Sequence, residues 1–82
     1  MQTYSFEFRV DDPIDDATTE KLYGRCDDAM TGCENGQWYV AFDRDADSLD
    51  HATKTALDDV IASGIMPGSM VIDSEGLACL NQ

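Results

Sequence analysis

The sequence predicts one domain of the α+β class, with a four-stranded antiparallel sheet and two helices on one face of it. The chain has 82 residues, enough for a single small domain over residues 1–82. Hydrophobic residues make up 43% of it, an ordinary fraction for a globular protein and too high for a disordered acidic tail. Segments with strand patterning and segments with helical spacing follow one another in the order strand, helix, strand, strand, helix, strand.

Residues 3–10 predict the first strand, because polar side chains alternate there with Tyr4, Phe6, Phe8 and Val10. The segment 11–13, Asp-Asp-Pro, ends this strand.

A short helix is expected next, over Ala17–Arg25. Asp15 or Asp16 is its expected N-cap, because a carboxylate accepts hydrogen bonds from the first free backbone amides of a helix. The residues expected to be buried at this helix are Leu22, Tyr23 and Cys26.

A hairpin is expected in the middle of the chain. Asp28–Cys33 is a weak strand candidate, and Trp38–Asp43 is a stronger one that is apolar on both faces, as is typical of a central strand. Asn35-Gly36 lies between them, and both residues can adopt the positive φ that a two-residue hairpin turn requires.

The second helix is predicted to begin after Ser48 as N-cap, with Asp50 in its first turn. Residues at helical spacing follow, and Gly64 is the expected residue that ends the helix. The set at helical spacing is Leu49, Ala52, Thr53, Ala56, Val60 and Ile61. Met70–Ile72 predicts a short last strand, followed by a turn at 74–76 and a tail over 77–82.

This order of elements with a central hairpin is the ferredoxin-like βαββαβ pattern of two split β-α-β units. Each unit requires a right-handed crossover, so both helices are expected on one face of the four-stranded antiparallel sheet.

Charge is the property in which the sequence departs most from the average. Seventeen Asp and Glu stand against five Lys and Arg, which gives a formal net charge of −12. A small domain needs a net charge of only about 2–8 to stay in solution, so the excess favours a basic protein surface as partner. The same charge disfavours direct binding of nucleic acid and of anionic membranes. Capping or solvated carboxylates, or adaptation to high salt, are the structural alternatives.

Cysteine usage and the N-terminus indicate a cytoplasmic protein. Cys26, Cys33 and Cys79 form no C-x-x-C pair, and free thiols are expected, with a Cys26–Cys33 disulfide as the alternative. The first residues have no basic leader with an apolar segment, and no apolar run approaches the roughly 20 residues that span a bilayer.

No catalytic, metal or cofactor site is predicted. His51 is the single histidine, and we expect it to be exposed in the first turn of the second helix, outside any catalytic arrangement. The segment 43–47, Asp-Arg-Asp-Ala-Asp, has the spacing that begins a calcium loop. However, Ser48 occupies the glycine position and Lys54 the position of the bidentate glutamate, so a charged turn between strand and helix is the simpler interpretation. Phosphate-binding glycine motifs and the RNA-binding aromatic motif are absent from the sequence.

Three segments of the sequence together suggest a family. They are LYGRCDDA at 22–29, VAFDRDADSL at 40–49 and TKTALDDV at 53–60. In this pattern the chain resembles the small N-terminal domain of bacterial XRE-like helix-turn-helix regulators linked to mobile elements. The resemblance covers most of the chain and implies a regulatory or dimerisation role. The sequence ends at Gln82, where the DNA-binding segment of that family would begin, so DNA binding is not implied.

In size, acidity and small α+β layout the chain is also similar to phage anti-CRISPR proteins. Several of those imitate DNA and occupy the basic target-binding surface of a Cas complex. This similarity implies a non-enzymatic inhibitor that acts in the cytoplasm of a bacterial host cell.

We therefore expect an acidic binding protein that inhibits a nucleic-acid-binding complex, such as a Cas effector, by mimicking the charge of DNA. It would act without a cofactor, as a monomer or weak homodimer. The alternative is a regulatory or dimerisation module related to helix-turn-helix regulators. The carboxylates expected to bind the partner form a main set and a second patch: Asp43, Asp45, Asp47, Asp50, Asp58 and Asp59, and then Asp11, Asp12, Asp15 and Asp16.

Overall fold

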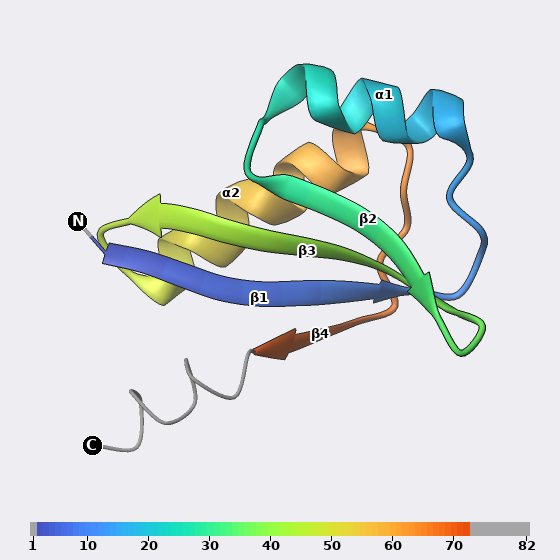
Figure 1. The fold of residues 1–82 in the computed structure, drawn as a ribbon. Helices are drawn as coiled ribbons and strands as arrows, with labels where there is room; N and C mark the ends of the chain where they lie inside the picture. The colour runs from blue at the N-terminus through green and yellow to red at the C-terminus, as the bar shows by residue number, and fades with distance from the viewer. Residues whose placement is uncertain (1, 73–82) are drawn as a thin grey trace.

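A computed structural model describes residues 2–72 of the chain and shows an α+β domain with a four-stranded antiparallel sheet and two helices (Figure 1). The elements in chain order are β1 (Gln2–Val10), α1 (Asp16–Arg25), β2 (Ala29–Glu34), β3 (Gln37–Ala46), α2 (Leu49–Ala62) and β4 (Ser69–Ile72). The class, the order of elements and the antiparallel sheet were all predicted. The turn at 74–76, the tail from 77 and Cys79 lie outside the described residues.

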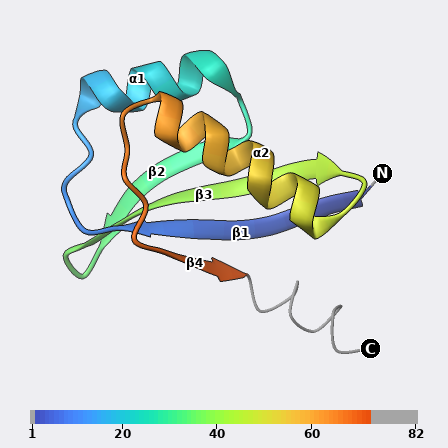
Figure 2. The same ribbon diagram turned by 180° about the vertical axis from the view of Figure 1, so that it is seen from behind.

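The strands lie in the order β2-β3-β1-β4, and each neighbouring pair is antiparallel. β1 and β3 form the centre and pair along their whole length, from Gln2 opposite Ala46 to Val10 opposite Trp38. The prediction that the strand after the hairpin is central is therefore confirmed. Seen from behind, α2 crosses one face of the sheet, and α1 lies beside it near β2 (Figure 2).

The core fills the space between the sheet and the helices. Phe6 stacks on Phe42 with ring centroids 5.5 Å apart, and Phe8 meets both rings edge-on. Leu22 of α1 and Val60 of α2 are fully buried against this aromatic group. The alternation seen in residues 3–10 thus places one side of β1 in the core, because successive side chains of a strand point to opposite faces.

The helix ends confirm the sequence signals. The Asp15 side chain accepts a hydrogen bond from the Thr18 amide at 2.7 Å, and the Ser48 hydroxyl accepts one from the His51 amide at 3.1 Å. Gly64 has φ +95° and follows the last turn of α2, where its amide donates to the Ile61 carbonyl. These contacts satisfy backbone groups that a helix end would otherwise leave without partners.

Backbone conformation and a side-chain hydrogen bond also account for the hairpin turn and for the outer edge of β2. Asn35 and Gly36 have φ of 53° and 80°, as the Asn-Gly signal predicts. On the outer edge of β2, the Thr31 amide donates to the Tyr23 hydroxyl of α1 at 3.1 Å. A bond of this kind covers part of an edge that could otherwise pair with another chain.

Two expectations were wrong. The strand predicted to end at Asp43 continues to Ala46, so the segment 43–46 is not a turn. Tyr23 is 46% exposed instead of buried, because its hydroxyl reaches the edge of β2. Ile61 belongs to the set at helical spacing but is 52% exposed, because the buried residues of α2 are Ala52, Ala56 and Val60.

Cys26 and Cys33 are free thiols, so the alternative of a disulfide between them is excluded. The Cys26 thiol contacts the Leu22 carbonyl at 3.6 Å, and burial, followed by the carboxylates of Asp59 and Asp28, raises its pKa. Within residues 2–72, neither helix is long and apolar enough to cross a membrane.

Candidate protein-binding surface

Arg44 organises the charged residues around the end of β3. It points to the core side of the sheet and is only 9% exposed, because Phe42, Arg44 and Ala46 alternate on that side. Its guanidinium binds both oxygens of Asp28, through Nε at 2.8 Å and Nη2 at 2.9 Å. Nη2 also donates to Asp59 of α2 at 3.0 Å.

Two further contacts complete the environment of this guanidinium. Nη1 donates to the Thr55 hydroxyl at 3.2 Å, and the group lies 5.0 Å from the centre of the Phe42 ring, within cation–π range. Hydrogen bonds from Arg44 hold the pKa of Asp28 below its ordinary value, and those same bonds raise the pKa of Arg44. Arg44 therefore stays positively charged, and carboxylates of the same protein neutralise that charge.

Asp59 is also occupied. Besides Arg44 it accepts a hydrogen bond from Arg25 of α1 at 3.3 Å, so one carboxylate links β3, α1 and α2. Predicted as a partner-binding residue, it lies instead in an internal ion-pair network, with its side chain 18% exposed. The remaining members of the main set, Asp43, Asp45, Asp47, Asp50 and Asp58, are exposed and make no ion pair with another residue of the described chain.

Asp43 and Asp45 are held in place by hydroxyl groups of the neighbouring strand. On the side of the sheet opposite α1 and α2, Ser5 lies opposite Asp43 and donates to its Oδ1 at 2.6 Å. Thr3 lies opposite Asp45 and donates to its Oδ1 in the same way. The two carboxylates are i, i+2 on one strand, about 6.6 Å apart along β3. Their orientation is therefore set before any partner arrives.

An open hollow lies where β3 extends past the start of β2. β2 begins at Ala29 opposite Phe42, so residues 43–46 of β3 have no β2 neighbour. Five carboxylates and two guanidinium groups line the hollow, together with Cys26 and Thr55: Asp27, Asp28, Asp43, Asp45 and Asp59, with Arg25 and Arg44. Because Arg44 and Arg25 bind Asp28 and Asp59, the uncompensated charge belongs to Asp27, Asp43 and Asp45.

Asp47 and Asp50 extend this negative region to the start of α2, where both are exposed. We call the group Asp27, Asp43, Asp45, Asp47 and Asp50 the acidic end. Asp58 is exposed on α2, where Lys54 lies one helical turn before it. An (i, i+4) pair of this kind interacts weakly in water, so Asp58 contributes less net charge to its surroundings.

The second predicted patch lies at the other end of the sheet. Thr3 marks the acidic end and Val10 the opposite end of β1, about 23 Å away at the rise of a strand. Asp11, Asp12 and Asp16 are exposed there. Asp15 caps α1, and hydrogen bonds from the Thr18 side chain and amide lower its pKa. The structure therefore separates the predicted carboxylates into two groups that one small contact would not cover.

The side of the sheet that α1 and α2 leave uncovered, here called the open face, carries a row of apolar residues. Met30 of β2 is opposite Ala41 of β3, and Val71 of β4 is opposite Glu7 of β1 in the same cross-strand row. Met30 is 64% exposed although it lies in a strand. In the next row the Tyr39 ring lies over Gly32, where a Cβ atom would come within 2.5 Å of the ring carbon Cζ. The glycine thus leaves room for the ring to lie across β2.

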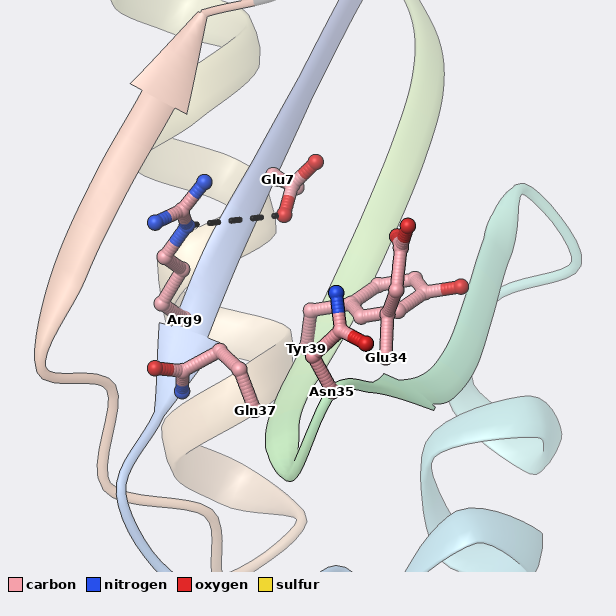
Figure 3. A pocket seen from close by; sticks show the side chains of 6 residues that line it. All are labelled: Glu7, Arg9, Glu34, Asn35, Gln37 and Tyr39. Atoms are coloured by element: carbon pink, nitrogen blue, oxygen red, sulfur yellow. Dashed lines mark ion pairs between the residues drawn. The ribbon is translucent and has the colours of Figure 1, made fainter.

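A second hollow lies on the open face near the hairpin (Figure 3). Glu7 and Arg9 come from β1, with a carboxylate-to-guanidinium distance of 3.9 Å, and Tyr39 and Gln37 come from β3. The Gln37 amide donates to the Val10 carbonyl at 2.9 Å, which ties the hairpin to β1. Glu7 and Arg9 offset each other's charge here, whereas Glu34 of β2 lines the same hollow and forms no ion pair with another residue of 2–72.

Sequence reasoning missed Thr3, Ser5, Arg44 and Met30 as parts of this surface. A sequence signal was present for Thr3, Ser5 and Arg44. Polar and apolar residues alternate in 3–10, and residues 42–46 alternate in the same way, with Arg44 between Phe42 and Ala46. For Met30 no sequence signal existed, since its exposure depends on which face of β2 the helices leave uncovered.

The chain matches no model of a known protein family, and neither a curated protein nor a solved structure matches it. The candidate surface must therefore be interpreted from its own geometry.

Proposed function

We propose that this protein binds a basic protein surface and inhibits a nucleic-acid-binding complex by presenting negative charge in place of DNA. A Cas effector of a bacterial cell is the target that we favour, as in the phage anti-CRISPR proteins that the chain resembles in size and acidity. The role requires neither catalysis nor a cofactor, and the protein would perform it in the bacterial cytoplasm.

The observation that carries the proposal is the held pair of carboxylates, Asp43 and Asp45. Each has one oxygen bound by a hydroxyl of β1, in a part of the structure where no cation neutralises it. Carboxylates with fixed orientation lose less conformational entropy on binding than flexible surface acids. They also attract Lys and Arg over a distance, which speeds encounter at low salt.

A competition assay tests this. Binding of labelled target DNA to a Cas effector complex is measured by fluorescence anisotropy, with increasing amounts of the protein. We expect DNA binding to be inhibited, and we expect the inhibition to weaken from about 0.05 M to about 0.5 M NaCl because salt screens the exposed charges.

Two matched variants locate the effect. The first carries Asn at Asp43, Asp45, Asp47 and Asp50, and the second carries Asn at Asp11, Asp12, Asp15 and Asp16. Each loses four carboxylates, and Asn is also a good N-cap at position 15. We expect the first variant to inhibit on the order of tenfold less well, at a few tenths of a kcal/mol or more per exposed charge, and the second to inhibit almost normally. Unchanged DNA binding with every candidate effector would refute the proposal.

A second candidate function follows from the exposed apolar side chains of the open face. A large, 64% exposed methionine in a strand is suited to a contact with another protein, which favours a regulatory or dimerisation module. The resemblance to the N-terminal domain of XRE-like regulators points to the same role. Sedimentation equilibrium discriminates the two: a concentration-dependent homodimer that is insensitive to salt supports the module, and a monomer at both low and high salt excludes it.

We also assign the chain to the ferredoxin-like arrangement. The support is the order βαββαβ together with the pairing of β1 between β3 and β4, which makes two split β-α-β units. An experimental structure in which α1 and α2 lie on opposite faces of the sheet would contradict this assignment.

A further inference from the structure

The open face combines the two features that a specific contact with a basic protein needs. Met30, Ala41 and Val71 lie in one cross-strand row that Glu7 of β1 interrupts, and one margin carries the held carboxylates of Asp43 and Asp45. Specific interfaces have an apolar centre surrounded by a polar margin, and a few central side chains provide most of their affinity.

The side chains at the centre suit insertion of a partner residue. Met30 is flexible and 64% exposed, and a methionine side chain adapts to the shape of what it contacts. The Tyr39 ring passes over Gly32 and is partly exposed, and an arginine can stack on a tyrosine ring. Glu7 interrupts the apolar row, but Arg9 lies 3.9 Å from its carboxylate and offsets its charge.

A second copy of this chain is a poor occupant of this face. Each copy has a net charge of −12, and two copies in face-to-face contact would bring their carboxylate margins close together. Like charges opposed across an interface are unfavourable. The charge of the margin instead complements a partner that presents Lys or Arg.

We infer that the open face, and not either helix or the Asp11–Asp16 end, is the contact surface for a basic protein. We further infer that this partner inserts an apolar or aromatic side chain between its cationic ones. This inference rests on the proposed function and adds to it the face that is used and the chemistry of the partner. Pure charge mimicry would require only the carboxylates, whereas this contact also requires Met30 and Tyr39.

Two synthetic peptides probe the inference directly. One alternates arginine with tryptophan, and the other has serine in place of each tryptophan, so that both have the same charge. Amide chemical shifts of the isotope-labelled protein are followed during titration with each. We expect the arginine–tryptophan peptide to bind at least about fivefold more tightly, a value in the range that one central contact provides. We expect it to shift the amides of Met30, Tyr39, Ala41 and Val71.

Two exposed methionines provide a matched pair of variants. Met30→Gln replaces the open-face methionine, and Met66→Gln replaces one that is 78% exposed in the loop before β4. We expect Met30→Gln to weaken binding of the arginine–tryptophan peptide about fivefold and Met66→Gln to change it less than about twofold. Both side chains are exposed, so neither variant should disturb folding, and the amide spectra report this directly.

Three outcomes would overturn the inference. They are equal binding of both peptides, shifts confined to α2 or to the Asp11–Asp16 end, and equal effects of the two methionine variants. Failure of both peptides to bind would overturn it as well. The competition assay with the effector complex tests the proposed function independently of the peptides. If the Met30→Gln variant inhibits DNA binding as well as the original protein does, the face assigned here is refuted and the proposed function stands.

Discussion

At the scale of single residues, Arg44 shows how a cation can be part of a small core. Arg44 occupies a position on the core side of β3 where the alternation would otherwise place an apolar residue. Asp28, before β2, and Asp59, in α2, neutralise its charge. No buried polar side-chain atom in the described chain lacks a hydrogen-bond partner, so the network is complete. A satisfied network of this kind holds the elements together. Removal of one member leaves the remaining charged groups partly buried without a partner, which destabilises the fold.

Replacement of Arg44 tests its structural role. We expect Arg44→Met to lower the free energy of unfolding by about 2–3 kcal/mol, less than for a fully buried pair because Asp28 and Asp59 are partly exposed. Urea unfolding measures the effect. Arg9→Met is the control, since that pair is exposed and 3.9 Å long, and it should cost less than about 0.5 kcal/mol. Equal effects of the two substitutions would show that Arg44 contributes no more than a surface ion pair.

Asp28 gives the network a dependence on pH. Its pKa in the folded protein is lowered by Arg44, so folding is favoured by the charged form. The stability that it contributes is complete above the ordinary carboxylate pKa of about 4 and is lost as the pH falls through the lowered folded-state pKa. We expect Asp28→Asn to be destabilising at pH 6, with the difference from the original protein decreasing towards pH 2. A difference that is constant over this range would contradict the assignment. Thermal unfolding at each pH is the measurement.

At the scale of elements, local signals determine the ends of the helices and the hairpin turn. The chain leaves α2 through Gly64, whose positive φ is costly for any residue with a Cβ atom. Gly24 is different, because it lies within α1, and a Cβ added there would meet no atom within 4 Å. The two glycines therefore have opposite consequences for stability.

The pair Gly64→Ala and Gly24→Ala tests this difference. We expect Gly64→Ala to destabilise the protein by about 1–2 kcal/mol, the cost of a left-handed residue with a side chain. We expect Gly24→Ala to stabilise it by about 0.5–1 kcal/mol, because alanine loses less backbone entropy in a helix. Thermal unfolding of both variants measures the two effects, and a stabilising Gly64→Ala would show that α2 does not end as described.

At the scale of the whole molecule, the acids act against folding and in favour of binding. Most exposed carboxylates have no cation near them in residues 2–72, and the two patches lie at opposite ends of the sheet. A net charge of −12 destabilises the compact state through self-repulsion. The same charges are the attractive part of the proposed contact.

Salt should therefore have opposite effects on the fold and on the complex. We expect the melting temperature of the free protein to rise between about 0.05 M and about 0.5 M NaCl, because screening reduces the repulsion. Over the same range the inhibition of DNA binding should weaken. Differential scanning calorimetry measures the first effect. A melting temperature that falls with salt would show that attractive ion pairs outweigh repulsion.

Much of the fold could be predicted because its signals are local. The alternation around Phe6 and Phe8, the Asn35-Gly36 turn and the Ser48 cap each act within a few residues. The end of β3 could not be predicted, because an alternation of Asp with Arg44 has the composition of a turn. It becomes a strand when Asp28 and Asp59, 16 and 15 residues away, supply the charges that Arg44 needs.

By itself the sequence determined the α+β class, the central hairpin, the helix caps and the excess of negative charge, because each depends on neighbouring residues or on composition. Only the tertiary structure decided that Asp59 is bound internally, that Asp43 and Asp45 are held by hydroxyls of β1, and that Met30 lies on the face that α1 and α2 leave uncovered. The physical reason is that strand pairing brings together side chains that are distant in the chain. Which carboxylates find a cation, a hydroxyl or only water depends on that pairing.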